Sequence, residues 1–141
     1  MDNLIGKKLD GLYEVKELIG SGGMANVYKA VMLGQNGPVP AGTVVAVKVL
    51  RQEYMHDPDL VRRFKNESKA ISLLNHPNIV KVYDVSVNDD LQYIVMEYVD
   101  GMTLREYLNQ RGGKLTNRET VHFISQILKA LEHAHANGVR S

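Results

Sequence analysis

A lysine in the middle of an apolar segment is the residue with the clearest chemical potential in this sequence. Residues 44–50 read Val-Val-Ala-Val-Lys-Val-Leu, a β-branched composition that predicts a buried strand. Because side chains alternate along a strand, Ala46 and Lys48 share one face. A buried ammonium group is costly unless it is paired, whereas a lysine at the edge of a sheet reaches water with its long stem. The strand alone leaves both alternatives open.

Glu67 is a candidate partner for Lys48. Residues 57–75 are predicted to form a helix, with Asp57 as N-cap and Pro58 at the first helical position. The inward stripe of this helix consists of Leu60, Phe64, Glu67, Ile71 and Leu74. We therefore predict a buried ion pair between Lys48 and Glu67. Desolvation roughly cancels the attraction within such a pair, so its presence favours a functional role over a stabilising one.

A glycine cluster, Gly20-Ser21-Gly22-Gly23, lies between predicted strands over residues 13–19 and 27–33. The backbone N–H groups of glycines can approach an anion closely because no Cβ blocks them. A flexible hairpin tip is the better interpretation of such a cluster when it stands alone. A P-loop is excluded because no GxxxxGK[ST] pattern occurs, and a dinucleotide-binding fingerprint is excluded because a strand follows the glycines where a helix is required.

The elements that would position these residues form an α+β arrangement. Five strands, separated by turn residues, are expected to form an antiparallel meander with the helix inserted after the third strand. The predicted strands cover residues 13–19, 27–33, 43–50, 79–87 and 91–98. After residue 99 the pattern is helical, with a short helix over 104–110 and a long helix that begins at a capping box, Thr116 with Glu119, and runs towards Asn137.

The order of these motifs resembles the serine/threonine protein kinase family. The resemblance rests on Gly20-Ser21-Gly22-Gly23-Met24-Ala25-Asn26-Val27, Val45-Ala46-Val47-Lys48, Glu67, His76-Pro77-Asn78-Ile79-Val80 and Ile94-Val95-Met96-Glu97-Tyr98-Val99. The Gly-Gly-Met-Ala loop looks like that of the bacterial, membrane-anchored, PASTA-kinase-like branch. The resemblance implies a kinase N-lobe with hinge over residues 9–99, a five-stranded antiparallel sheet with one regulatory helix. Residues 100–139 would be the first two helices of an incomplete C-lobe.

The resemblance also implies ATP with Mg as the cofactor. Lys48 matches the lysine that contacts the α- and β-phosphates, and Glu67 matches the acid that holds this lysine. Met96 falls at the gatekeeper position. The backbone C=O of Glu97 and the N–H of Val99 fall where the family reads the adenine edge, and Ala25 replaces the third glycine of the loop. The full implied binding set is Ile19, Gly20, Ser21, Gly22, Gly23, Val27, Ala46, Lys48, Val80, Met96, Glu97 and Val99.

The catalytic motifs of the family do not occur in these residues. The 141 residues contain neither His-Arg-Asp nor Asp-Phe-Gly, so the catalytic base and both metal ligands of the family are missing. We therefore expect a chain that binds ATP or ADP but does not transfer phosphate to protein serine or threonine by itself. The alternative is a kinase-derived dimerisation or interaction module without nucleotide function. An unrelated sheet-and-helix domain would require these ordered motifs to coincide by chance.

The composition limits the classes of partner and the cellular compartment that we expect for this chain. Seventeen basic and sixteen acidic residues leave a net charge of +1, which provides no global attraction to nucleic acid or to an anionic membrane. The absence of cysteine excludes disulfides and thiolate metal sites and suits a reducing compartment. No apolar run approaches the roughly 20 residues that cross a bilayer. We expect a cytoplasmic location, no membrane segment in these residues and no metal site, since His133 and His135 cannot share a helix face.

The last predicted helix has an unusually broad apolar surface. One stripe contains Val121, Ile124, Leu128, Leu131 and His135, and its neighbour contains Phe123, Ile127, Ala130 and Ala134. Such a surface belongs to a helix that is covered on several sides. In an intact kinase the remainder of the helical lobe would cover it. We therefore expect this chain to form a homodimer or a domain-swapped oligomer.

Overall fold

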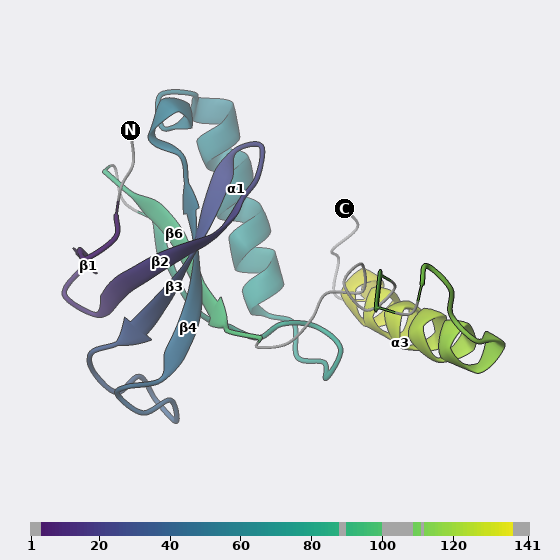
Figure 1. Ribbon diagram of the computed structural model, residues 1–141. Helices are drawn as coiled ribbons and strands as arrows, with labels where there is room; N and C mark the ends of the chain where they lie inside the picture. The colour runs from purple at the N-terminus through teal and green to yellow at the C-terminus, as the bar shows by residue number, and fades with distance from the viewer. Residues whose placement is uncertain (1–3, 88–89, 100–108, 111, 137–141) are drawn as a thin grey trace.

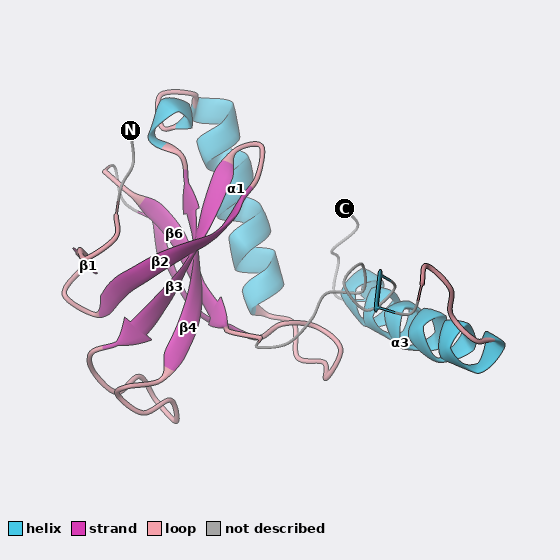
Figure 2. Ribbon diagram, in the orientation of Figure 1, coloured by secondary structure: helices cyan, strands magenta, loops and turns pink. Residues whose placement is uncertain are grey.

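The computed structural model describes residues 4–87, 90–99, 109–110 and 112–136, and its main feature is a sheet with one helix along it (Figure 1). The strands are β1 Lys8–Leu9, β2 Tyr13–Ser21, β3 Ala25–Met32, β4 Val44–Leu50, β5 Val82–Val87 and β6 Gln92–Glu97. A 3₁₀ turn, η1 Gln52–Tyr54, follows β4, and helix α1, Pro58–Ser72, lies along one face of the sheet. Helix α3, Asn117–Ala136, lies apart from the strands (Figure 2). The predicted α+β class is confirmed.

The sheet differs from the predicted meander in two ways. It has a sixth, two-residue strand, β1, paired with β2, and its strand order is β1-β2-β3-β4-β6-β5. After β4 the chain crosses the sheet through α1, enters the edge strand β5 and returns through β6, which pairs with β4. A long helical connection permits this crossover, whereas a tight turn would have forced the next strand beside β4.

Both long helices begin where the sequence predicts. Asp57 caps α1, because its Oδ1 accepts hydrogen bonds from the N–H groups of Asp59 and Leu60 at 3.0 and 3.3 Å. The predicted capping box of α3 is also present. Thr116 N–H donates to Glu119 Oε1 at 3.0 Å, and Glu119 N–H donates to Thr116 Oγ1 at 3.1 Å. Most of the predicted short helix over 104–110, and the predicted end of the long helix at Asn137, lie outside the described residues.

One face of the sheet carries the larger core, and we call it the tyrosine face. Its buried residues are Leu9, Tyr13, Val15, Tyr28, Ala30, Met32, Val45, Val47, Val49, Tyr93 and Val95. The sheet curls around this core, because Tyr13 on β2 donates a hydrogen bond of 2.8 Å to Asp84 on β5 although three strands separate them. Tyr93 donates similarly to Asp10, and the two tyrosine rings meet edge to face with centroids 6.0 Å apart. Burial, followed by the neighbouring carboxylates, raises the pKa of both phenols above the ordinary tyrosine range.

The opposite face, which we call the helix face, carries a smaller core. Ala25, Leu50 and Ile94 pack there against Phe64 of α1. Lys48 and Ala46 belong to this face because side chains alternate along β4, whose odd-numbered valines Val45, Val47 and Val49 all lie on the tyrosine face. The helix face therefore carries the residues that the sequence singled out.

Candidate functional site

The glycine cluster spans the end of β2 and the turn to β3, so it lies at a hairpin, as predicted. Ser21 pairs with Asn26, and the Gly22 N–H donates to the Ala25 C=O at 2.8 Å. A Cβ built on Gly20 or Gly22 would meet its nearest neighbour at an ordinary 3.7 or 3.5 Å, and one on Gly23 would meet no atom within 4 Å. Packing of the protein on itself therefore does not require glycine at these positions. An external group that approaches the backbone would require it.

Strand register brings two of the predicted phosphate residues, Gly20 and Lys48, into one row with the predicted adenine residue Val27. Gly20 on β2 pairs with Val27 on β3, Val27 with Lys48 on β4, and Lys48 with Ile94 on β6. Directly opposed residues of antiparallel strands share a face, so Val27 and Lys48 lie side by side on the helix face. Lys48 is half-buried, and no ion pair involves it among the residues that the structure describes. The glycine turn and this ammonium group lie at the same end of the sheet.

Two of the predicted adenine residues lie in a second row beside the first. Ala46 on β4 pairs with Met96 on β6, two residues along from Lys48 and therefore on the same face. Ala46 is buried and Met96 is half-buried. Ile19 and Val80 are 43% and 40% exposed, and Val99 is 65% exposed. Large apolar side chains with this exposure could pack against a flat apolar ligand.

Backbone and ring contacts fix the segment at the end of β6. Glu97 N–H donates to the Lys81 C=O at 2.8 Å, and Glu97 Oε1 accepts a 3.3 Å hydrogen bond from the Lys81 N–H. The Lys29 ammonium lies 5.1 Å from the centroid of the Tyr98 ring, a cation–π contact that joins β3 to the segment after β6. These contacts hold Glu97 and Tyr98, the first two residues of the predicted hinge Glu97–Val99, at the end of β6.

Glu67 does not lie where the sequence predicts. It is exposed, and the buried residues of α1 are Phe64 and Ser68. Although the structure describes both side chains, no ion pair joins Glu67 to Lys48. The predicted burial of Glu67 is therefore wrong. Phe64 packs into the helix-face core, and the small Ser68, whose hydroxyl donates to the Phe64 C=O at 2.5 Å, follows it one turn later. Glu67 is thereby turned to the flank, where its carboxylate stays hydrated.

Helix α3 is attached to the loop that follows α1, an attachment that the sequence does not reveal. Asn75 N–H donates to His133 Nε2 at 3.1 Å, and the Asn78 side-chain amide donates to the Gln126 C=O and Oε1 at 2.9 and 2.8 Å. The imidazoles of His76 and His133 lie 5.2 Å apart. Partners 48 or more residues apart leave no local pattern, so sequence reasoning assigned no role to these side chains.

The broad apolar surface predicted for the last helix is exposed in this structure. Relative exposure ranges from 46% to 67% at Val121, Ile124, Ile127, Leu128 and Leu131. No helix in the described part of the chain is long and apolar enough to cross a membrane. In the same residues, no group of three or more acidic or histidine side chains is arranged to hold a metal ion.

Known proteins match this chain along nearly its whole length. The protein kinase domain family model matches residues 13–140. The chain is 45% identical over 138 residues to the serine/threonine-protein kinase PrkC of Bacillus subtilis, which is 96% of this chain and 20% of that protein. It is 39% identical over 135 residues to the serine/threonine-protein kinase PknB of Mycobacterium tuberculosis, which is 93% of this chain and 20% of that protein.

A solved structure agrees with these sequence matches. The kinase domain of Mycobacterium tuberculosis PknI superposes with a TM-score of 0.77 at 29% identity, covering 98% of this chain and 54% of that one. This chain thus spans about a fifth of the curated relatives and about half of the solved kinase domain. The resemblance to bacterial serine/threonine kinases is confirmed, and the chain belongs to the protein kinase family.

Proposed function

We propose that this chain is the nucleotide-binding part of a bacterial-type serine/threonine protein kinase and that it binds ATP or ADP on the helix face of its sheet. The observation that carries the proposal is the strand register, which puts Gly20, Val27 and Lys48 in one row and Ala46 beside Met96 in the next. The phosphate chain would lie beside Gly20 and Lys48 of the first row. The flat base would lie beside Val27 of that row and beside Ala46 and Met96 of the next, which also contains Lys29.

Different residues of these rows would bind the phosphates and the base. The Lys48 ammonium would contact the α- and β-phosphates, and the backbone N–H groups of Gly20–Gly23 would approach them from the turn. Ile19, Val27, Ala46 and Val80 would enclose the base, beside Met96. The Glu97 C=O would accept a hydrogen bond from the edge of the base, and the Val99 N–H would donate one to it. Because the described residues offer no acidic cluster for Mg²⁺, the ion would enter as the counter-ion of the nucleotide, held by phosphate and water.

The ion pair between Lys48 and Glu67 remains a prediction, now for a different position of α1. Glu67 would have to turn from the flank of α1 towards the helix face to reach Lys48. That pair would hold the lysine against the phosphates, the role that the family resemblance implies. We propose that the present position of α1 is one in which phosphate positioning is incomplete.

Phosphoryl transfer to protein serine or threonine is proposed for the intact kinase only. These 141 residues contain neither a His-Arg-Asp nor an Asp-Phe-Gly motif. Without a base and metal ligands, positioning of the nucleotide alone does not complete the transfer step. We also propose that residues 9–99 form the N-lobe with hinge, that residues 100–139 belong to the C-lobe, and that the chain works in the cytoplasm, where ATP is available.

A second candidate function, self-association, is favoured by the exposed apolar surface of α3. Burial of Val121, Ile124 and Leu128 against a second copy would remove apolar area from water. A homodimer or a domain-swapped oligomer would follow, with or without nucleotide binding. Light scattering at micromolar concentration tests this candidate, and a clean monomer contradicts it.

The nucleotide proposal is tested by calorimetric titration of the chain with Mg-ADP. Lys48→Met should weaken binding about ten- to hundredfold, because a charge-assisted contact contributes about 1.5–3 kcal/mol. Lys16→Met removes an exposed lysine that pairs with Glu14 on β2 and is the matched control. No binding by the wild-type chain at millimolar Mg-ADP, or equal affinity in the Lys48→Met variant, contradicts the proposal.

A further inference from the structure

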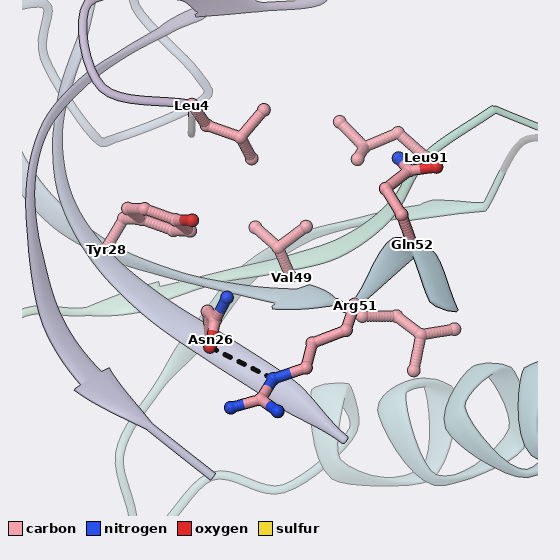
Figure 3. A pocket seen from close by; sticks show the side chains of 8 residues that line it. Leu4, Asn26, Tyr28, Val49, Arg51, Gln52 and Leu91 are labelled. Carbon is pink, nitrogen blue, oxygen red and sulfur yellow. Dashed lines mark hydrogen bonds between the residues drawn. The ribbon is translucent and has the colours of Figure 1, made fainter. Parts of the chain in front are cut away.

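Arg51, which lies directly after β4, contacts both strands of the glycine turn. Its Nη2 donates to Ser21 Oγ at 2.5 Å and its Nε donates to Asn26 Oδ1 at 3.2 Å. Ser21 is the last residue of β2 and Asn26 is the second residue of β3, so the guanidinium spans the two strands that support the turn. Figure 3 shows Arg51 with its guanidinium beside Asn26.

The three side chains form a closed hydrogen-bond triangle in which every proton direction is determined. Arginine only donates and an amide oxygen only accepts, so the Ser21 hydroxyl accepts from Arg51 and donates to Asn26 Oδ1 at 2.9 Å. The main chain reinforces the triangle, because the Arg51 N–H donates to the Met24 C=O at 2.9 Å. The Arg51 guanidinium also makes a longer contact, in which Nη1 lies 3.9 Å from Glu53 Oε1.

The triangle lies on the opposite side of the sheet from Lys48. Asn26 pairs with Val49, whose side chain belongs to the core of the tyrosine face. Opposed residues share a face, so Asn26 and the guanidinium beside it lie on the tyrosine face. Arg51 therefore does not line the nucleotide site and acts on it only through the position of the glycine turn. Its side chain is 27% exposed, which limits the screening of its hydrogen bonds by water.

We infer that Arg51 is a positioning residue of the nucleotide site. Its guanidinium ties Ser21 and Asn26 to the end of β4 and so sets the position of the glycine turn relative to Lys48. The inference rests on the proposed nucleotide function. In this role Arg51 positions the glycine turn and does not contact the ligand. Its two partners, Asn26 and Ser21, are 25 and 30 positions away in the sequence.

Amide hydrogen exchange and Mg-ADP titration of the chain test this inference together. Arg51→Ala should speed exchange over residues 20–26 by about three- to tenfold in the free chain and weaken Mg-ADP binding by a similar factor. Arg51→Lys, which keeps the charge but not the planar fork, should restore part of both. Arg62→Ala removes an arginine paired with Asp59 on α1 and should change neither.

A double variant distinguishes positioning through the Arg51–Ser21 hydrogen bond from a general structural role of Arg51. Because Arg51 acts through Ser21, the Arg51→Ala/Ser21→Ala double variant should behave much like Arg51→Ala alone. Its amide exchange should be little faster and its Mg-ADP affinity little weaker than those of the single variant. Additive losses, or exchange and affinity equal to wild type in Arg51→Ala, overturn the inference. If the wild-type chain does not bind Mg-ADP, the proposed function fails, and exchange at the turn still decides whether the tie exists.

Discussion

The tyrosine face and the helix face are formed by the same strands, yet they differ in how much apolar surface they bury. On the tyrosine face eleven buried residues form one core, and two phenol–carboxylate hydrogen bonds close the curl of the sheet over it. On the helix face only four buried residues form the core around α1, and the half-buried Lys48 lies between Val27 and Ile94 without an ion-pair partner among the described residues. Stability therefore resides mainly on one face, and the chemistry available for binding resides on the other.

The largest expected effect is on stability, when a tyrosine is removed from the larger core. Tyr93 is 1% exposed, so Tyr93→Ala should cost about 3–5 kcal/mol of unfolding free energy, the range for loss of a buried aromatic side chain. Leu73→Ala is the control, because Leu73 is 78% exposed and should change the free energy by less than about 0.5 kcal/mol. Urea denaturation measures both. Equal costs would show that the tyrosine face is not the main source of stability.

Alkaline pH should weaken the same face. The pKa of Tyr13 and of Tyr93 is raised by burial and by Asp84 and Asp10, so the folded state holds both phenols protonated. Their contribution is complete below a pH of about 10 and is lost as the pH rises above that value, at up to about 1.4 kcal/mol per pH unit for each phenol. The measurement is unfolding free energy against pH. A Tyr13→Phe/Tyr93→Phe variant should show a shallower fall, and an identical slope would contradict the assignment.

The glycine turn offers a change that should affect binding but not stability. Gly22→Ala places a Cβ 3.5 Å from the Ala25 carbonyl oxygen, an ordinary contact, so the unfolding free energy should stay within about 0.5 kcal/mol of wild type. Mg-ADP affinity should fall about tenfold, because the Cβ blocks the approach of phosphate to the backbone. Gly34→Ala is the matched control, since a Cβ there meets nothing within 4 Å and Gly34 follows the end of β3 that is far from the glycine turn. Equal affinities would remove the turn from the binding site.

The smallest expected effect concerns Glu67. Its side chain is exposed in this structure, so Glu67→Gln should change the unfolding free energy of the free chain by less than about 0.5 kcal/mol. Loss of one member of a buried pair would instead cost about 3–5 kcal/mol. Glu53→Gln, at an exposed glutamate of η1, provides the comparison by thermal denaturation. A large loss specific to Glu67 would show that the pair with Lys48 is already formed.

Features encoded by neighbouring residues were predictable, and features that depend on distant partners were not. Asp57 and Pro58 mark the start of α1, and Thr116 with Glu119 marks that of α3, because caps act within one turn. The strand order β4-β6-β5 depends on how α1 crosses the sheet, which no local pattern records. The same limit hid the tie between Arg51 and Ser21.

The error at Glu67 has a particular cause. Residues 67 and 68 are adjacent on the helix, and the stripe of apolar spacing fits either position. Ser68 is the residue that is buried, since its hydroxyl is satisfied by the Phe64 C=O within the same helix. Neither a serine nor a carboxylate contributes to an apolar pattern, so the pattern itself did not decide which of the two positions is buried. By contrast, Ala46 and Lys48 were placed correctly on one face, because alternation along a strand has a period of two.

The most direct test of the division between the two faces is a backbone amide NMR titration of the chain with Mg-ADP. We predict chemical-shift changes concentrated at residues 20–27, 46–48 and 96–99, with the tyrosine face around Tyr13 and Tyr93 nearly unchanged. Saturable changes confined to these residues would support nucleotide binding on the helix face. Changes centred on the tyrosine face, or no change at millimolar Mg-ADP, would contradict it.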